Sequence, residues 1–169
     1  MFSIKAIILK SKRGNMTITN VNSNTFLADT IILIRDKVRD NITDPLVASR
    51  PTPEKFVLTS YPQRGVTYPI ITVTDRGIIQ PQRLGMASEG TVLTMNIEIR
   101  LWARNIAERD ELTQQIYTYL RQNQLDATTG LSDSNLHDFT LTSTVNIDDP
   151  GVQGIRSKVM EFSFLVVIS

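Results

Sequence analysis

The apolar positions between Thr94 and Gln122 change their spacing halfway along the segment. In the first half every second residue is apolar: Met95, Ile97, Ile99 and Leu101. This alternation predicts a strand with one buried face. From Glu108 onward the apolar residues recur at helical spacing: Leu112, Ile116, Tyr119 and Leu120. We therefore predict a strand that turns at Asn105 into an amphipathic helix over 107–123.

Another amphipathic helix is predicted at 24–42, with Asn24 or Thr25 suited to cap it. Its apolar residues recur at gaps of three and four: Leu27, Ile31, Ile34, Val38 and Ile42. A proline-rich loop follows at 43–55, and we expect it to be extended. Further strands are predicted at 56–60, 68–77, 137–147 and 158–168.

These elements predict an α+β fold, with two helices packed on one face of a mostly antiparallel or mixed sheet. The last two strands are joined by the short turn DDPGVQG, so they should pair as an antiparallel hairpin. Along 137–147, strict alternation predicts one face formed by Phe139, Leu141, Ser143, Val145 and Ile147. Residues 78–90 are apolar without periodicity and contain Pro81, Gly85 and Gly90, which predicts a long hairpin loop.

A chain of 169 residues is long enough for one domain with a substantial core. We predict an amino-terminal arm or edge strand at 1–23 and a single domain at 24–169. The apolar run Ile4 to Leu9 is interrupted by Lys5, so we interpret the amino end as non-secretory, and Met16 leaves open a later natural start. No segment reaches the ~20 apolar residues of a membrane helix, so no membrane partner is predicted.

The net charge and the residue types present limit which kinds of binding or catalytic site the chain can form. A formal charge of +1 gives no global attraction to nucleic acid or membrane. Cysteine is absent, which excludes thiolate chemistry and zinc–thiolate sites. The single histidine, His137, has no evident nucleophile partner, because Asp138 should point to the opposite face of the strand. The pairs Asp110/Glu111 and Asp148/Asp149 lack the ligand pattern of a calcium loop. The sequence predicts no enzyme activity, no cofactor and no metal.

Several apolar residues have no predicted helix or strand to bury them. They lie in the long hairpin loop: Ile78, Ile79, Leu84 and Met86. Together with Arg83 and the sole tryptophan, Trp102, they are our candidate contacts between subunits or with a tube. Alternation places Trp102 on the polar face of its strand, where a covering loop is the commoner arrangement and a subunit contact is the alternative.

Basic residues also fall in the predicted loops: Arg50, Arg64, Arg76 and Arg83. In the simpler interpretation they only keep the protein soluble. In the other, the loops gather at one end and contact a phosphate backbone or an acidic protein surface, which makes Arg50, Arg64 and Arg76 candidate loop contacts. No aromatic residues are interleaved with them, so specific recognition of nucleic acid is not indicated.

The layout resembles the tail terminator, or tail completion, proteins of long-tailed bacteriophages and related particles. The resemblance rests on the strand YPIITV, the strand that runs into RNIAERDELTQQIYTYLRQ, and two terminal strands around a connector. It covers about 24–169. The family has no catalytic motif, so no functional residue is carried over.

The resemblance implies a small α/β protein that forms a hexameric ring, caps the head-proximal end of the tail tube and stops its polymerisation. The implied partners are further copies of the chain, the tube protein, sheath and head-connector proteins, and DNA that passes through the ring without sequence recognition. The implied location is the tail or neck of the virion, assembled in the host cytoplasm. Two alternatives stay open: another neck or baseplate component, and a small enzyme or ligand-binding module.

Overall fold

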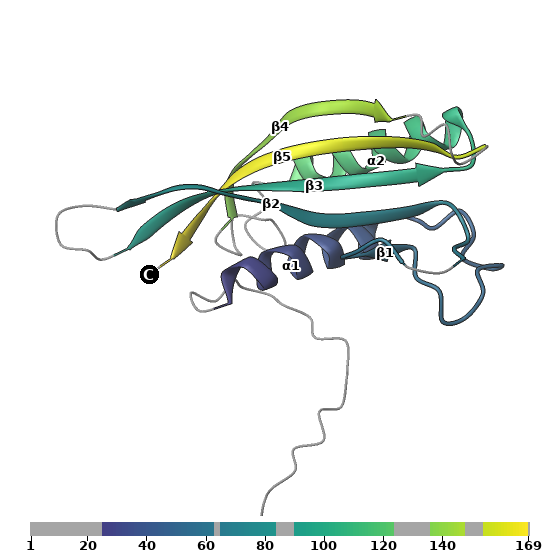
Figure 1. The fold of residues 1–169 in the computed structure, drawn as a ribbon, viewed down its shortest axis with the longest axis horizontal. Coiled ribbons are helices and arrows are strands. Elements are labelled where there is room, and N and C mark those ends of the chain that lie inside the picture. Colours follow the sequence, from purple (N-terminus) through teal and green to yellow (C-terminus); the bar gives the residue numbers. More distant parts are fainter. Residues whose placement is uncertain (1–24, 63–64, 84–89, 124–135, 148–153, 169) are drawn as a thin grey trace, which may run out of the picture.

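The computed structural model describes residues 25–62, 65–83, 90–123, 136–147 and 154–168. Within them it contains two helices and a mixed five-stranded sheet, which confirms the α+β prediction (Figure 1). The elements are α1 Phe26–Asn41, β1 Val57–Leu58, β2 Ile70–Arg83, β3 Thr91–Ala103, α2 Ile106–Asn123, β4 Leu136–Ile147 and β5 Arg156–Ile168. The strand order is β1-β2-β3-β5-β4, with β1 parallel to β2 and the other pairs antiparallel.

Both helices contribute to one core on one face of the sheet. From β3, the alternating apolar residues predicted from the sequence are fully buried: Met95, Ile97, Ile99 and Leu101. Three residues of α1 and three of α2 join the same apolar cluster: Leu33, Ile34, Val38, Leu112, Ile116 and Leu120. The two helices also meet directly, because the Asn41 amide donates a 2.8 Å hydrogen bond to the Tyr119 hydroxyl. Burial of each such aliphatic side chain stabilises the fold by about 1.5–3 kcal/mol.

Strand β2 is much longer than predicted, so residues 78–83 of the predicted hairpin loop are strand, while 84–89 lie outside the described residues. Ile78 and Ile79 belong to β2, where they pair with Met95 and Thr94 of β3. The strand continues because a shift of register between Asp75 and Gly77 absorbs the presumed turn, and Gly77 adopts a φ of 106°, which glycine tolerates. At the end of the sheet beyond α1, the residues from Ile79 to Arg83 of β2 pair with Thr94 to Thr91 of β3 and form a twisted ribbon, with the last residues of β5 on the other side of β3 (Figure 1). We call this segment of the two strands the β2–β3 ribbon.

The face predicted for 137–147 is wrong beyond Leu141. The β4–β5 pairing shifts register between Leu141 and Ser143, so the later residues change sides. Phe139 is 9% exposed and stacks on Phe162 with 4.7 Å between ring centroids, whereas Val145 is 51% exposed. The predicted antiparallel pairing of these two strands is confirmed.

Candidate functional site

The sheet face turned away from the helices carries a cavity of about 520 Å³. It lies over the carboxyl end of β3, between that strand, the start of β2, the loop after β1 and the residues that lead into β5. Its lining includes Tyr61, Tyr68, Thr74, Arg100, Trp102 and Ile155. We call it the Trp102 pocket. Its position follows from alternation, since Arg100 and Trp102 are two residues apart on the polar face of β3.

Aromatic side chains form one wall of the Trp102 pocket. The Tyr61 ring lies 4.8 Å from the Trp102 ring between centroids, tilted by 55°. Its hydroxyl lies 2.6 Å from the Tyr68 hydroxyl, and either oxygen can donate the hydrogen bond. Burial of Tyr68, followed by this hydrogen bond and the nearby Tyr61 charge, raises the pKa of Tyr68 to about 12. The loop after β1 therefore covers Trp102, the commoner of the two arrangements expected for it.

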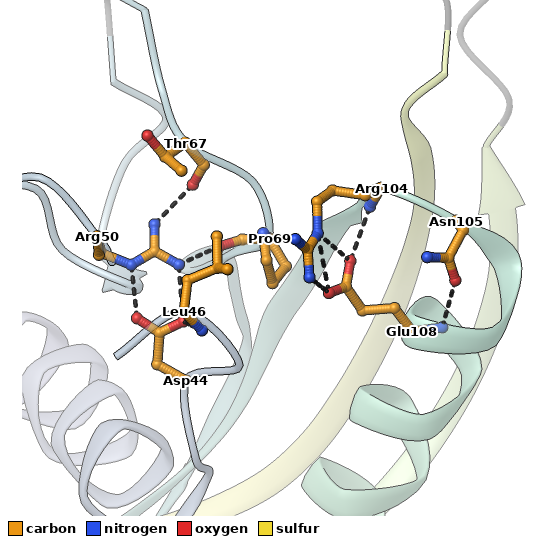
Figure 2. Close-up of polar contacts among 8 residues, drawn as sticks. All are labelled: Asp44, Leu46, Arg50, Thr67, Pro69, Arg104, Asn105 and Glu108. Carbon is orange, nitrogen blue, oxygen red and sulfur yellow. Dashed lines mark hydrogen bonds and ion pairs between the residues drawn. The ribbon is translucent and has the colours of Figure 1, made fainter. Parts of the chain in front are cut away.

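Arg50 fixes the backbone on both sides of Tyr68 (Figure 2). Its guanidinium binds Asp44 through two hydrogen bonds of 2.5 and 2.8 Å. It also donates to the carbonyl oxygens of Thr67, at 2.6 Å, and Pro69, at 2.7 Å. Burial would raise the pKa of Asp44, but the bonds from Arg50 and the Leu46 amide outweigh it and hold that pKa below 3.8. Arg50, a predicted partner contact, is thus engaged inside the chain, and its side chain is 6% exposed.

The corner between β3 and α2 lies beside the loop that carries Asp44 and Arg50 (Figure 2). Asn105 accepts a 2.8 Å hydrogen bond from the Glu108 amide, as an N-cap residue does. The Glu108 carboxylate in turn accepts hydrogen bonds from the Arg104 amide and guanidinium. Burial raises the pKa of Glu108, and these bonds to Arg104 outweigh that effect and lower it overall. The predicted turn at Asn105 is therefore a capped helix start.

Charged residues continue the polar face toward the middle of the sheet. Glu98 and Glu161 are direct partners in the β3–β5 ladder, and Arg76 forms an ion pair with Glu98 and a 3.6 Å contact with Glu161. The positive charge of Arg76 therefore offsets the repulsion between these two carboxylates. Arg100 is not part of this group. Its guanidinium carbon lies 4.6 Å from the centroid of the Trp102 ring, which places a cation over an aromatic face.

The predicted basic loop contacts do not gather at one end, so that interpretation is wrong for the described residues. Arg50 lies in the 43–55 loop beside the start of β2, Arg76 lies in the middle of β2, and the backbone of Arg83 lies at its far end in the β2–β3 ribbon. Arg64, Leu84 and Met86 lie outside the described residues. The contacts proposed for Ile78, Ile79, Arg83 and Trp102 stay predictions, because they concern partner chains.

The other candidates from the sequence have ordinary surroundings where they are described. His137 lies in β4 opposite Leu165 of β5. Asp110 binds Arg109 at 2.9 Å and Lys158 at 3.0 Å, and these bonds lower its pKa. Asp148 and Asp149 lie outside the described residues. In the described ranges, no three or more His, Cys, Asp or Glu side chains are grouped to hold a metal ion. No helix there has the length and apolar character needed to cross a membrane.

Comparison with known proteins adds no relative: no family model matches the chain, and no curated protein is significantly similar to it. The sequence singled out Trp102 but missed Tyr61, Tyr68 and Arg100. A usable signal existed for Arg100, because alternation puts it on the same face as Trp102. No local signal places Tyr61 there, since its position depends on a loop that the Arg50 contacts hold.

Proposed function

We propose that this chain is a structural subunit of a bacteriophage tail, forming a ring that caps the head-proximal end of the tail tube. The ring ends tube polymerisation and offers a joining surface to the head connector. The proposal combines the resemblance of the sequence to tail terminator proteins with a fold of the class that the resemblance implies. It concerns binding between proteins and involves no chemical step.

The observation that carries the proposal is the β2–β3 ribbon. Its backbone extends beyond α1, and its sequence from Ile78 to Met86 contains four large apolar residues (Figure 1). Large apolar segments outside the helix-covered part of a domain are typical of surfaces that another chain covers. A neighbouring copy is the proposed cover, at the scale of ~800 Å² per partner for a specific interface.

The two ends of the molecule differ, which suits a part that stops growth. The β2–β3 ribbon lies at one end, and the 43–55 loop with the β3–α2 corner lies at the other (Figure 1). At this loop end Val47 is 77% exposed and Ile106 is 54% exposed. A ring whose two axial surfaces are unlike binds the last tube ring through one of them. It presents no copy of the tube's own surface on the other, so further tube subunits find no complementary site.

The first test is the mass of the assembled protein. Native mass spectrometry of the purified chain, alone and with tail tubes, should give a hexamer. Ile79→Asp should weaken it, because a buried interface tolerates an unpaired carboxylate poorly. Val145→Asp is the matched control, since Val145 is exposed on β4 and pairs with Val159, which lies opposite Arg100 rather than opposite the ribbon end of β3. A chain that stays monomeric with tubes present and leaves tube length unchanged when its gene is deleted would falsify the proposal.

A different axial position is the neighbouring alternative. Electron microscopy of particles that carry a labelled chain separates a terminator at the head-proximal tip from a neck or baseplate component. Label at the baseplate would contradict the assignment as a terminator, but it would not contradict the proposal that the chain forms a ring.

A further inference from the structure

We propose that the Trp102 pocket binds a small organic monocarboxylate with a flat apolar body, and that the guanidinium of Arg100 anchors its carboxylate. This site is independent of the proposed ring and stands on the geometry of one chain.

The first argument is the state of Arg100. Its Nε is enclosed and has no hydrogen-bond partner among the described residues. Among the described residues, the two terminal nitrogens of the same group are not both buried and unpaired as Nε is, and Arg100 lines the cavity. Because water cannot reach Nε, hydrogen bonds that stabilise the positive charge of the guanidinium can form only at the two terminal nitrogens. A carboxylate oxygen on each of them forms the parallel pair of charge-assisted hydrogen bonds that arginine favours.

The surroundings hold Arg100 ready for a ligand. Its position over the Trp102 ring restrains the guanidinium, and a restrained donor loses less entropy when an anion binds. Glu98 is near enough to line the same cavity, yet it pairs with Arg76. Within the described part of the chain, no carboxylate pairs with Arg100, although a neighbouring one lines the same cavity.

The walls define the body of the ligand. Tyr61, Trp102 and Ile155 supply apolar surface, and the hydroxyl of Tyr68 adds a polar group at the rim. A volume of about 520 Å³ lies within the ~300–1,000 Å³ of typical small-molecule pockets. Aromatic walls beside one cation suit a flat apolar body with one acidic group.

The nearby charges favour one negative charge over two. Glu98, Glu161, Arg76 and Arg100 together carry no net charge at neutral pH, so a bound monocarboxylate leaves the patch with one negative charge. A phosphate dianion would leave two, beside the carboxylates of Glu98 and Glu161. Repulsion in such a partly enclosed site is stronger than in water.

The probes for the test are benzoate, acetate, benzyl alcohol and inorganic phosphate, added separately to the full chain. Trp102 is the single tryptophan, so one indole N–H signal in the NMR spectrum of the isotope-labelled protein reports on the pocket. We expect benzoate to shift this signal saturably. Acetate lacks the body, benzyl alcohol lacks the charge, and phosphate carries extra charge, so each should bind at least about tenfold more weakly. Equal affinity for phosphate or benzyl alcohol would overturn the assignment.

Variants separate the anchor from a general effect on the fold. Arg100→Gln should raise the dissociation constant for benzoate at least about tenfold, since a charged hydrogen-bond donor is lost. Arg100→Lys keeps the charge and should bind with intermediate affinity. The matched control is Arg121→Gln, because Arg121 also lies over an aromatic ring, that of Tyr117 on α2. Unchanged benzoate affinity in a folded Arg100→Gln, or an equal loss in Arg121→Gln, refutes the role of Arg100.

Discussion

At the scale of single residues, Arg50 links a loop to the cavity on the far side of the sheet. Its bonds to the carbonyls of Thr67 and Pro69 fix the backbone that carries Tyr68. Tyr68 in turn holds Tyr61, which packs on Trp102. A buried guanidinium with four hydrogen bonds can order the loop to which it is bonded.

Replacing Arg50 should therefore destabilise the fold and disturb Trp102. Arg50→Ala removes the cation that pairs with Asp44 and the donor to two carbonyl oxygens, which costs about 2–4 kcal/mol of unfolding free energy. Arg50→Lys should recover only part of this, because an ammonium cannot reproduce the planar fork. Denaturant titration followed by Trp102 fluorescence measures both effects. Arg121 is exposed, so Arg121→Ala should cost less than about 1 kcal/mol, and an equal cost in both variants would contradict the proposed role of the Arg50 hydrogen bonds.

Tyr68 should ionise at a pH well above that at which an ordinary tyrosine ionises. Its pKa of about 12 in the folded protein exceeds the unfolded value, so the neutral form is stabilised by folding. The corresponding stability is fully present below pH ~10 and is lost as the pH rises toward the folded pKa. NMR titration of labelled tyrosine rings should show the ionisation of Tyr68 at this high pH. Tyr61→Phe should lower the pKa of Tyr68 by removing the hydrogen bond. A wild-type Tyr68 that titrates together with the other tyrosines would contradict the geometry.

At the scale of elements, the bulge in β4 decides which side chains belong to the core. Phe139→Ala should cost about 3–5 kcal/mol, as expected for an aromatic residue packed against Phe162. Val145→Thr should change stability by less than about 0.5 kcal/mol, because Val145 lies beyond the register shift and is exposed. Chemical denaturation of the two variants checks the contrast. Similar losses in both would mean that the strand keeps strict alternation.

Local pattern was sufficient wherever one buried face runs without interruption. The β3–α2 segment was predicted closely because alternation and helical spacing are both set by neighbours in sequence, and Asn105 marks the change. Pattern failed at bulges, since the side-chain period is two and one added residue reverses the faces. That is why the side of β4 on which Val145 lies was predicted wrongly.

The length of β2 could not be predicted for a related reason. Gly77 and Pro81 are ordinarily turn residues, yet each adjoins a register shift within the strand. Proline is tolerated there because β1 pairs only with Ile71 and Thr72, so this part of β2 has no other described strand beside it. The Trp102 pocket escaped prediction because its walls come from β2, β3, β5 and the intervening loop, whose approach depends on long-range contacts.

At the scale of the whole molecule, the fold separates a body with its own core from the β2–β3 ribbon that projects from it (Figure 1). The core cluster contains residues from both helices and from every strand. Such a body does not depend on the tip of the ribbon for its folding. Assembly and stability can therefore be tested separately on one chain.

Shortening the ribbon should abolish the ring and spare the body. Gln82 and Val92 are ladder partners, so replacing the segment 83–91 by Asn-Gly closes β2 and β3 with a two-residue turn and removes Leu84 and Met86. We expect the circular dichroism and the Trp102 fluorescence of the parent, but the mass of a monomer. The parent should also melt at a higher temperature as its concentration rises, because association stabilises the folded state by mass action, and the variant should not. A shortened chain that still forms a hexamer would place the subunit contacts outside the removed segment and exclude Leu84 and Met86 as necessary contacts.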